Sequence, residues 1–128
     1  MPEKIKVALV GLGNCFSGLI QGIEYYSKNP SQKVTGIIHE NLRDYTIHDI
    51  EFVAGFDVGA NKVGKPINDA IYELPNMVNW IDKNDMPKAN GNVYESPALD
   101  GVGIWVENKV KPIESGKSES ELREEIIK

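Results

Sequence analysis

The sequence lacks the features that mark several protein classes. It has one cysteine, Cys15, which excludes both an internal disulfide framework and a zinc site built from several thiolates. No apolar run approaches the about 20 residues that a transmembrane helix needs, and the N-terminus lacks the layout of a signal peptide. With 14 basic against 19 acidic residues, the net charge of −5 offers no attraction to nucleic acid or to an anionic membrane. We expect a cytoplasmic protein whose partners include neither nucleic acid nor membrane.

What the chain does contain is enough for one domain. Its 128 residues, 41% of them hydrophobic, match the size and composition of a single core, so we expect one domain over residues 1–128. The two histidines, His39 and His48, lack the spacing of metal ligands and therefore predict no metal site.

The N-terminal part of the chain follows a strand, turn and helix pattern. Residues 5–10 are short and almost wholly apolar, which is typical of a parallel strand covered on both faces. Apolar residues then recur at helical spacing over 15–26 and predict one apolar face packed on that strand. Residues 27–48 are mixed in character and predict an inserted connection, with a short extended piece around 34–38.

The same pattern repeats along the rest of the chain. Residues 50–57 predict a second strand that ends in an acidic residue. Pro66 suits the first turn of a second helix, because its φ is preset, and that helix should close at 74–75. A short third strand is expected over 92–94.

The end of the chain predicts one more helix. Ser118 and Glu121 have the spacing of a capping box that starts a helix near residue 119. The alternating order predicts an α/β fold with a doubly wound, Rossmann-like parallel sheet. No further strand follows the last helix, so we expect the first, adenosine-binding half of such a fold, cut short and carrying the insertion at 27–48.

A glycine-rich turn is the first candidate site. Gly11-Leu12-Gly13-Asn14-Cys15-Phe16 lies between the first strand and the first helix, where the amides of the first helical turn have no partner in the helix. Gly11 permits the tight turn, and Gly13 lets a pyrophosphate approach the backbone. The third position of this fingerprint is usually Gly or Ala, but here it is Phe16. The alternative is a strand-to-helix turn that binds nothing.

Asp57 is the second candidate. An acidic side chain at the end of the second strand hydrogen-bonds an adenosine ribose and disfavours a 2′-phosphate, so NAD is preferred over NADP. It lies 44 residues after Gly13, farther than the usual about 20, and the insertion absorbs the difference. The alternative is that Asp57 caps the next turn.

Two further features carry weaker hypotheses. Residues 59–65 have the spacing of a nucleoside-triphosphate phosphate loop, but Pro66 supplies neither the hydroxyl nor the N–H that such a loop needs. We therefore do not expect ATP-dependent phosphoryl transfer. Cys15 lies near a helix N-terminus without a general base nearby in sequence, so it is interpreted as a small residue filling the turn.

Several pieces of the chain together resemble a known family, the archaeal and actinobacterial type of myo-inositol-1-phosphate synthase, over about residues 4–106. The pieces are the Gly-x-Gly-Asn-Cys turn at 11–15, the Gln-Gly-x-Glu-Tyr-Tyr segment at 21–26, Phe56-Asp57-Val58, Lys62-Val63-Gly64-Lys65 and Leu99-Asp100-Gly101. These short motifs in this order indicate the family far more specifically than the number of glycines does.

The resemblance implies an isomerase, also called inositol-3-phosphate synthase, that serves inositol and phospholipid biosynthesis. Such enzymes convert glucose 6-phosphate to an inositol monophosphate by NAD-dependent oxidation, aldol closure and reduction, and we expect a homo-oligomer. By resemblance, the NAD-binding residues are Gly11, Gly13, Asn14, Cys15, Asp57, Val58, Asn76, Ser96 and Leu99.

The same resemblance limits what this chain does alone. The family's catalytic lysines lie beyond the matching region, so no catalytic residue is assigned and the 128-residue chain is expected to be inactive by itself. Phe16 and Pro66 also depart from the family's pattern, which favours Ala and an acidic residue there. They support an alternative, a non-catalytic dinucleotide-binding or assembly module that has lost the active site.

Overall fold

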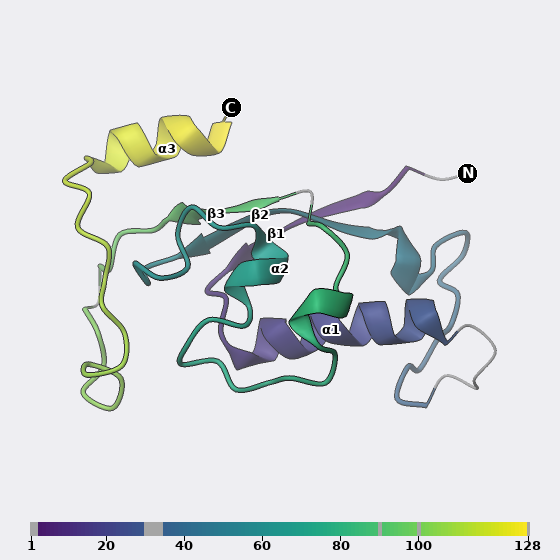
Figure 1. Cartoon of the computed structure of the whole chain (residues 1–128). Helices are drawn as coiled ribbons and strands as arrows, with labels where there is room; N and C mark the ends of the chain where they lie inside the picture. Colours follow the sequence, from purple (N-terminus) through teal and green to yellow (C-terminus); the bar gives the residue numbers. More distant parts are fainter. Residues whose placement is uncertain (1–2, 30–34, 90, 100, 128) are drawn as a thin grey trace.

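The computed structural model describes residues 3–29, 35–89, 91–99 and 101–127. Within these ranges, three strands form one parallel sheet, with β1 (Ile5–Val10), β2 (Ile50–Asp57) and β3 (Asn92–Glu95) side by side in that order (Figure 1). This is the strand order of the first half of a doubly wound sheet. The predicted Rossmann-like α/β fold and its three strands are confirmed.

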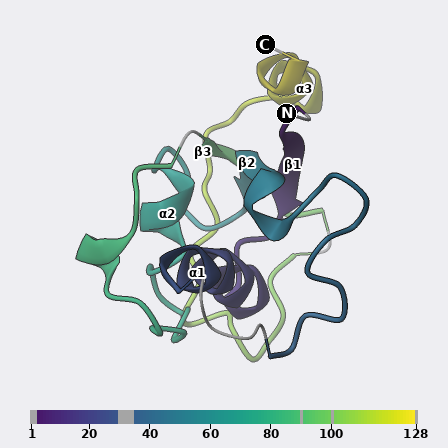
Figure 2. The ribbon, with the colours of Figure 1, turned by 90° about the vertical axis from the view of Figure 1, so that its right-hand side faces the viewer.

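The α-helices are divided unequally between the two sides of the sheet. α1 (Asn14–Lys28) joins β1 to β2, α2 (Ile67–Ala70) lies between β2 and β3 in sequence, and both helices lie on the same side of the sheet. α3 (Glu119–Ile127) lies on the opposite side (Figure 2). Two short 3₁₀ helices, η1 (Ile47–Asp49) and η2 (Lys83–Asp85), complete the elements. None of the helices in the described ranges has the length and apolar character needed to cross a membrane.

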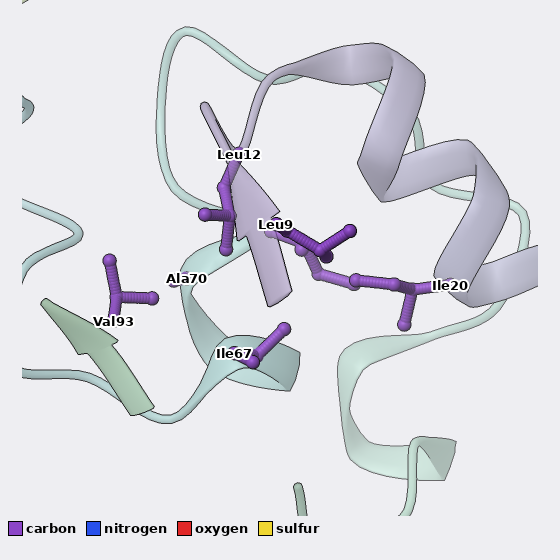
Figure 3. Packing of buried hydrophobic residues seen from close by; sticks show 7 residues of the cluster. Leu9, Leu12, Ile20, Ile67, Ala70 and Val93 are labelled. Atoms are coloured by element: carbon purple, nitrogen blue, oxygen red, sulfur yellow. The ribbon is translucent and has the colours of Figure 1, made fainter. Parts of the chain in front are cut away.

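The hydrophobic core lies between the sheet and the side that carries α1 and α2 (Figure 3). Its buried members are Leu9, Leu12, Ile20, Ile67, Ala70, Ile71 and Val93. Gly55 in the middle strand makes room for Leu12, because a Cβ at Gly55 would lie 2.8 Å from the Leu12 Cδ1 atom. The glycine turn is thereby anchored in the core through a side chain of its own.

One expectation about burial was wrong, and a second holds for only part of the apolar face of α1. β1 is not covered on both faces: Leu9 is 2% exposed, but Val10, which points to the opposite face, is 73% exposed. The reason is that helices cover only one face beside this strand. On α1 the buried positions include the polar Ser17 and Gln21, whereas Leu19 is 45% exposed. Backbone groups of a neighbouring loop face this side of the helix and need polar partners.

The lengths of some elements also differ from expectation. Residues 35–38 form a turn and a bend rather than an extended piece, and residue 34 lies outside the described residues. α2 ends at Ala70 rather than near 74–75, and Pro66 is the residue before the helix, with φ −57° and ψ 145°. The reason is that the chain turns back directly after Ala70, through a series of turns that ends at the cis Leu74-Pro75 bond.

The start of α3 agrees with its prediction. The Ser118 N–H donates to Oε2 of Glu121 at 2.7 Å, and the Glu121 N–H donates to Oγ of Ser118 at 3.3 Å. The expected capping box is confirmed.

Candidate functional site

The glycine turn joins the end of β1 to the start of α1. Gly11 adopts φ +79°, and its N–H donates to the carbonyl oxygen of Phe56 at 2.7 Å, which ties the turn to β2. Gly13 is the residue before the helix and offers no side-chain cap, and the first helical turn carries no acidic residue. Among the described residues, the amides at the start of α1 therefore have no partner within the helix and no side-chain cap from Gly13, and they carry the positive end of the helix dipole.

The space in front of this turn is open. A Cβ at Gly11 or at Gly13 would meet no atom within 4 Å. Phe16 is half-buried and packs against the hydrophobic core, so its ring is directed to the core. Cys15 is exposed and free. The turn is thus shaped so that an anion can reach its amides, which is the fit that a diphosphate requires.

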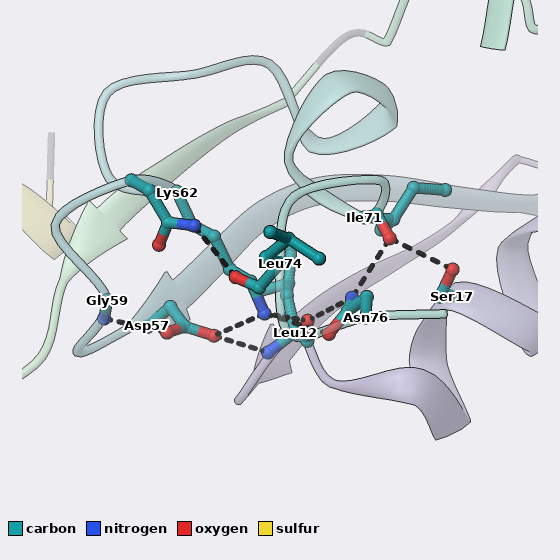
Figure 4. Close-up of polar contacts among 9 residues, drawn as sticks. Leu12, Ser17, Asp57, Gly59, Lys62, Ile71, Leu74 and Asn76 are labelled. Atoms are coloured by element: carbon teal, nitrogen blue, oxygen red, sulfur yellow. Dashed lines mark hydrogen bonds and ion pairs between the residues drawn. The ribbon is translucent and has the colours of Figure 1, made fainter. Parts of the chain in front are cut away.

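Asp57 connects this turn with the loop after β2 (Figure 4). Its Oδ2 atom accepts the N–H of Leu12 at 2.8 Å, and its Oδ1 atom accepts the N–H of Gly59, also at 2.8 Å. The second bond caps the next turn, which is the alternative role considered for this residue. The first bond was not predicted. Each carboxylate oxygen keeps a further lone pair, so these bonds leave acceptor capacity for a ligand hydroxyl.

The buried side chain of Lys62 contacts the backbone of the glycine turn, and this residue was not among the predicted site residues. It is 5% exposed, and its Nζ atom donates to the Leu12 carbonyl oxygen at 2.7 Å and to Oδ1 of Asn76 at 3.0 Å. Its Nζ also lies 4.0 Å from Oδ2 of Asp57. Burial lowers the pKa of Lys62, and the carboxylates of Asp57 and Glu73 oppose this effect.

Asn76 reaches the same carbonyl from the other side. Its Nδ2 atom donates to the Leu12 carbonyl oxygen at 2.8 Å and to the Ile71 carbonyl oxygen at 2.9 Å. The residue is 7% exposed, and all three of these polar contacts, including the one to Lys62, lie within the chain. Asn76, predicted to line the cofactor cleft, thus supports the glycine turn from inside.

The remaining predicted residues lie around the ends of the strands. Oδ1 of Asn14 accepts the N–H of Met77 at 2.7 Å. The Ser96 N–H donates to the Asp57 carbonyl oxygen at 3.0 Å, which places Ser96 beside Asp57. The Val58 carbonyl accepts a hydrogen bond at 2.8 Å from the N–H of Ile113. Leu99 lies in the turn after β3 and is 82% exposed.

The second glycine loop does not form a phosphate cradle. Its amides are used inside the protein, because the Gly64 N–H donates to the Val93 carbonyl and the N–H groups of Lys62 and Val63 donate to the Gly59 carbonyl. Lys65 pairs with Glu73 at 2.7 Å rather than standing free above the loop. This geometry does not favour nucleoside-triphosphate binding. In the described ranges no three metal-ligating side chains gather into a group.

Comparison with known proteins finds relatives of this chain among the inositol-3-phosphate synthases. The chain is 47% identical over 100 residues to the inositol-3-phosphate synthase of Corynebacterium glutamicum, a match that covers 77% of the chain and 27% of that protein. It is 39% identical over 109 residues to the inositol-3-phosphate synthase of Mycobacterium tuberculosis, covering 84% of the chain and 29% of that protein. The chain is related to the inositol-3-phosphate synthases. It spans less than one third of the length of these curated relatives, and no protein-family model matches it.

Two solved structures have a fold similar to that of this chain. The crystal structure of Ari2 superposes with a TM-score of 0.63 at 32% identity, covering 74% of this chain and 30% of that one. A myo-inositol-1-phosphate synthase-related protein from Thermotoga maritima superposes with a TM-score of 0.64 over 98% of this chain and 31% of its own. At 20% identity the second likeness shows the fold alone. The resemblance to the synthase family is confirmed.

Proposed function

We propose that this chain is the N-terminal dinucleotide-binding part of an inositol-3-phosphate synthase and that its ligand is NAD. The observation that carries the proposal is the glycine turn at Gly11 and Gly13, which presents uncapped amides to open space in a chain related to those synthases. The half-buried side chain of Asp57 and the buried side chains of Lys62 and Asn76 hold the turn in this shape.

Each predicted residue has a role in this proposal. Gly11 permits the tight turn with its positive φ, the amides of Gly13, Asn14 and Cys15 donate to the diphosphate, and the Asp57 carboxylate accepts from the adenosine ribose. Val58, Ser96 and Leu99 lie near the adenosine, with Asn76 supporting the turn from inside. When bound, NAD supplies the capacity to take up a hydride and to return it. The chain's own residues bind and orient it.

The proposal extends to the whole protein. We infer an isomerase that converts glucose 6-phosphate to an inositol monophosphate as a cytoplasmic homo-oligomer, as the resemblance implies. Its catalytic lysines would lie outside this chain. The chain alone should therefore give no detectable turnover of glucose 6-phosphate, and measurable product would show that catalytic groups lie within it.

Two residues had favoured a degenerate module instead, and neither disturbs the turn. Phe16 packs against the core, and Pro66 lies directly before α2, where it bridges to Asn92 of β3. Both departures from the family's pattern are accommodated by the fold, which supports a turn that still binds a dinucleotide.

Calorimetric titration with NAD and with NADP tests the proposal. We expect saturable binding of NAD and weaker binding of NADP, because a 2′-phosphate would approach the Asp57 carboxylate. A Gly13→Leu variant should lose NAD binding without losing stability, because its side chain extends into open space. Gly22→Leu, also without neighbours within 4 Å of its Cβ, is the matched control and should bind normally. Wild-type chain that binds neither dinucleotide contradicts the proposal.

A further inference from the structure

We propose that Lys62 is a positioning residue for the diphosphate, and that it acts by turning the Gly13 N–H outward. The inference rests on the proposed function, since it concerns how the same turn binds a dinucleotide. It gives a ligand-binding purpose to a buried lysine that the nucleotide-binding fingerprint does not include.

The first step is the orientation of one peptide group. The Leu12 carbonyl oxygen accepts from two buried donors, Lys62 Nζ at 2.7 Å and Asn76 Nδ2 at 2.8 Å. In a planar trans peptide the C=O and the N–H point in opposite directions. The carbonyl of the Leu12–Gly13 peptide faces the interior, so the Gly13 N–H of the same peptide faces away from the interior. A Cβ at Gly13 would also meet no atom within 4 Å, so this side of the turn is open.

The peptide group before it, between Gly11 and Leu12, is held through its N–H. The Leu12 N–H donates to Oδ2 of Asp57, and that carboxylate oxygen lies 4.0 Å from Lys62 Nζ. Leu12 is therefore held at its N–H by an acidic side chain and at its C=O by a basic one. A glycine-rich turn is otherwise mobile, and ordering it on binding would cost affinity. The buried pair removes that cost in advance.

The charge of Lys62 adds a second effect. A hydrogen bond from an ammonium group to a carbonyl is stronger than one from a neutral donor, and it polarises the peptide that accepts it. The N–H of that peptide becomes a better donor to an anion. Burial lowers the pKa of Lys62, but its two hydrogen-bond acceptors and the carboxylate of Asp57 surround the ammonium form.

The charge of Lys62 also affects the stability of the fold. Burying an ammonium group is costly, but removing one partner of a buried ion pair leaves the other charge, here Asp57, without its neighbour and destabilises the protein. In a Lys62→Met variant the Leu12 carbonyl keeps its bond to Asn76, but Oδ1 of Asn76 loses the Lys62 ammonium group as its donor. A loss of stability alone therefore does not separate a structural role of Lys62 from a positioning role, and the test has to compare ligands.

The test compares two ligands on two variants of the full chain. Lys62→Met removes the buried ammonium group, and Lys65→Met on the same loop removes a lysine that pairs with Glu73 on the surface. ADP-ribose carries a diphosphate and adenosine does not. For Lys62→Met we expect the affinity for ADP-ribose to fall about tenfold relative to that for adenosine, and for Lys65→Met we expect no change in this ratio. A purely structural role would weaken both ligands equally.

The outcomes separate the inference from the proposed function. Wild-type chain that binds neither NAD nor ADP-ribose overturns both. Wild-type chain that binds ADP-ribose, with Lys62→Met unchanged in its ligand ratio, overturns the inference alone. If Lys62→Met does not fold, amide hydrogen exchange on the wild type decides: the Gly13 N–H should exchange freely without ligand and become protected with ADP-ribose. Protection of Gly13 before ligand is added would overturn the inference.

Discussion

At the scale of single residues, the Asp57 carboxylate does more than the ribose contact predicted for it. It holds Leu12 and Gly59, which belong to two different turns, and it lies beside the Lys62 ammonium group. If this carboxylate also accepts from the ribose, as we propose, it links folding to binding at one position. Its replacement should affect both.

Asp57→Asn tests this double role. An amide offers one acceptor where the carboxylate offers two, so either the Leu12 or the Gly59 N–H faces an NH₂ group. We expect NAD affinity to fall by about 1–3 kcal/mol and the free energy of unfolding to fall as well. Calorimetry and urea denaturation measure the two effects. Asp69→Asn, whose surface pair with Lys83 is exposed, is the control. Unchanged NAD affinity would remove Asp57 from the site.

Lys62 should make stability depend on alkaline pH. Its pKa is lowered in the folded chain by burial, so the unfolded chain holds this proton to a higher pH. Between the two pKa values the unfolded state binds more protons, and the stability contributed at this position rises with pH. The unfolding free energy of wild type minus that of Lys62→Met should therefore increase on approaching the usual lysine pKa from below. Denaturation at a series of pH values measures it, and a difference that falls with pH contradicts the assignment.

These residues also show which part of the site was predictable. Gly11, Gly13 and Asp57 lie in local motifs at strand ends. The two glycines predict a tight turn, and the aspartate predicts a hydrogen-bond acceptor. Lys62 and Asn76 act on Leu12 from 50 and 64 residues away along the chain. Nothing in their spacing indicates a backbone carbonyl as the partner, because that contact exists only after the sheet has formed.

At the scale of elements, the lengths of the apolar runs and the turn residues that end them predicted the strands well. The apolar runs that became β1 and β2 are bounded by turn residues and reach the lengths predicted, 5–10 and 50–57. The buried face of α1 was less accessible to prediction. Gln21 lies inside because its side-chain oxygen accepts from the Trp80 and Ile81 amides, which a helical apolar pattern cannot reveal.

Two glycines in different elements should respond oppositely to the same substitution. Gly55→Ala in β2 places a Cβ 2.8 Å from Leu12 Cδ1 in a packed core, and we expect a loss of about 1–3 kcal/mol of stability. Gly22→Ala in α1 meets no atom within 4 Å and should gain about 0.5–1 kcal/mol from better helix propensity. Urea denaturation of both variants measures the effects. Equal responses would contradict the packing of Leu12 against β2.

At the scale of the whole molecule, one side of the sheet is less protected than the other. β1 is an edge strand of the described sheet, and its Val10 side chain, which points away from the face that carries Leu9, is 73% exposed. Exposed apolar edges favour pairing between chains. The helices α1 and α2 protect only the opposite side, as Figures 1 and 2 show.

This uneven cover predicts self-association of the chain. Sedimentation at increasing concentration should show a rising mean mass, and Val10→Lys should reduce it, because a charge at the exposed edge opposes pairing. Ile38→Lys, at a position 92% exposed in the connection between α1 and β2, controls for added charge and should change the association less. A chain that stays monomeric at high concentration would argue that the exposed edge has no role in assembly.

The claim on which the account depends most is that the amides at the start of α1 hold the diphosphate of a dinucleotide. Amide resonances of the wild-type chain, followed by NMR during titration with NAD, test it directly. We predict that the largest saturable shifts belong to Gly13, Asn14 and Cys15 and that NADP produces them only at higher concentration. Saturable binding of NAD that leaves these three amides unmoved would contradict the claim.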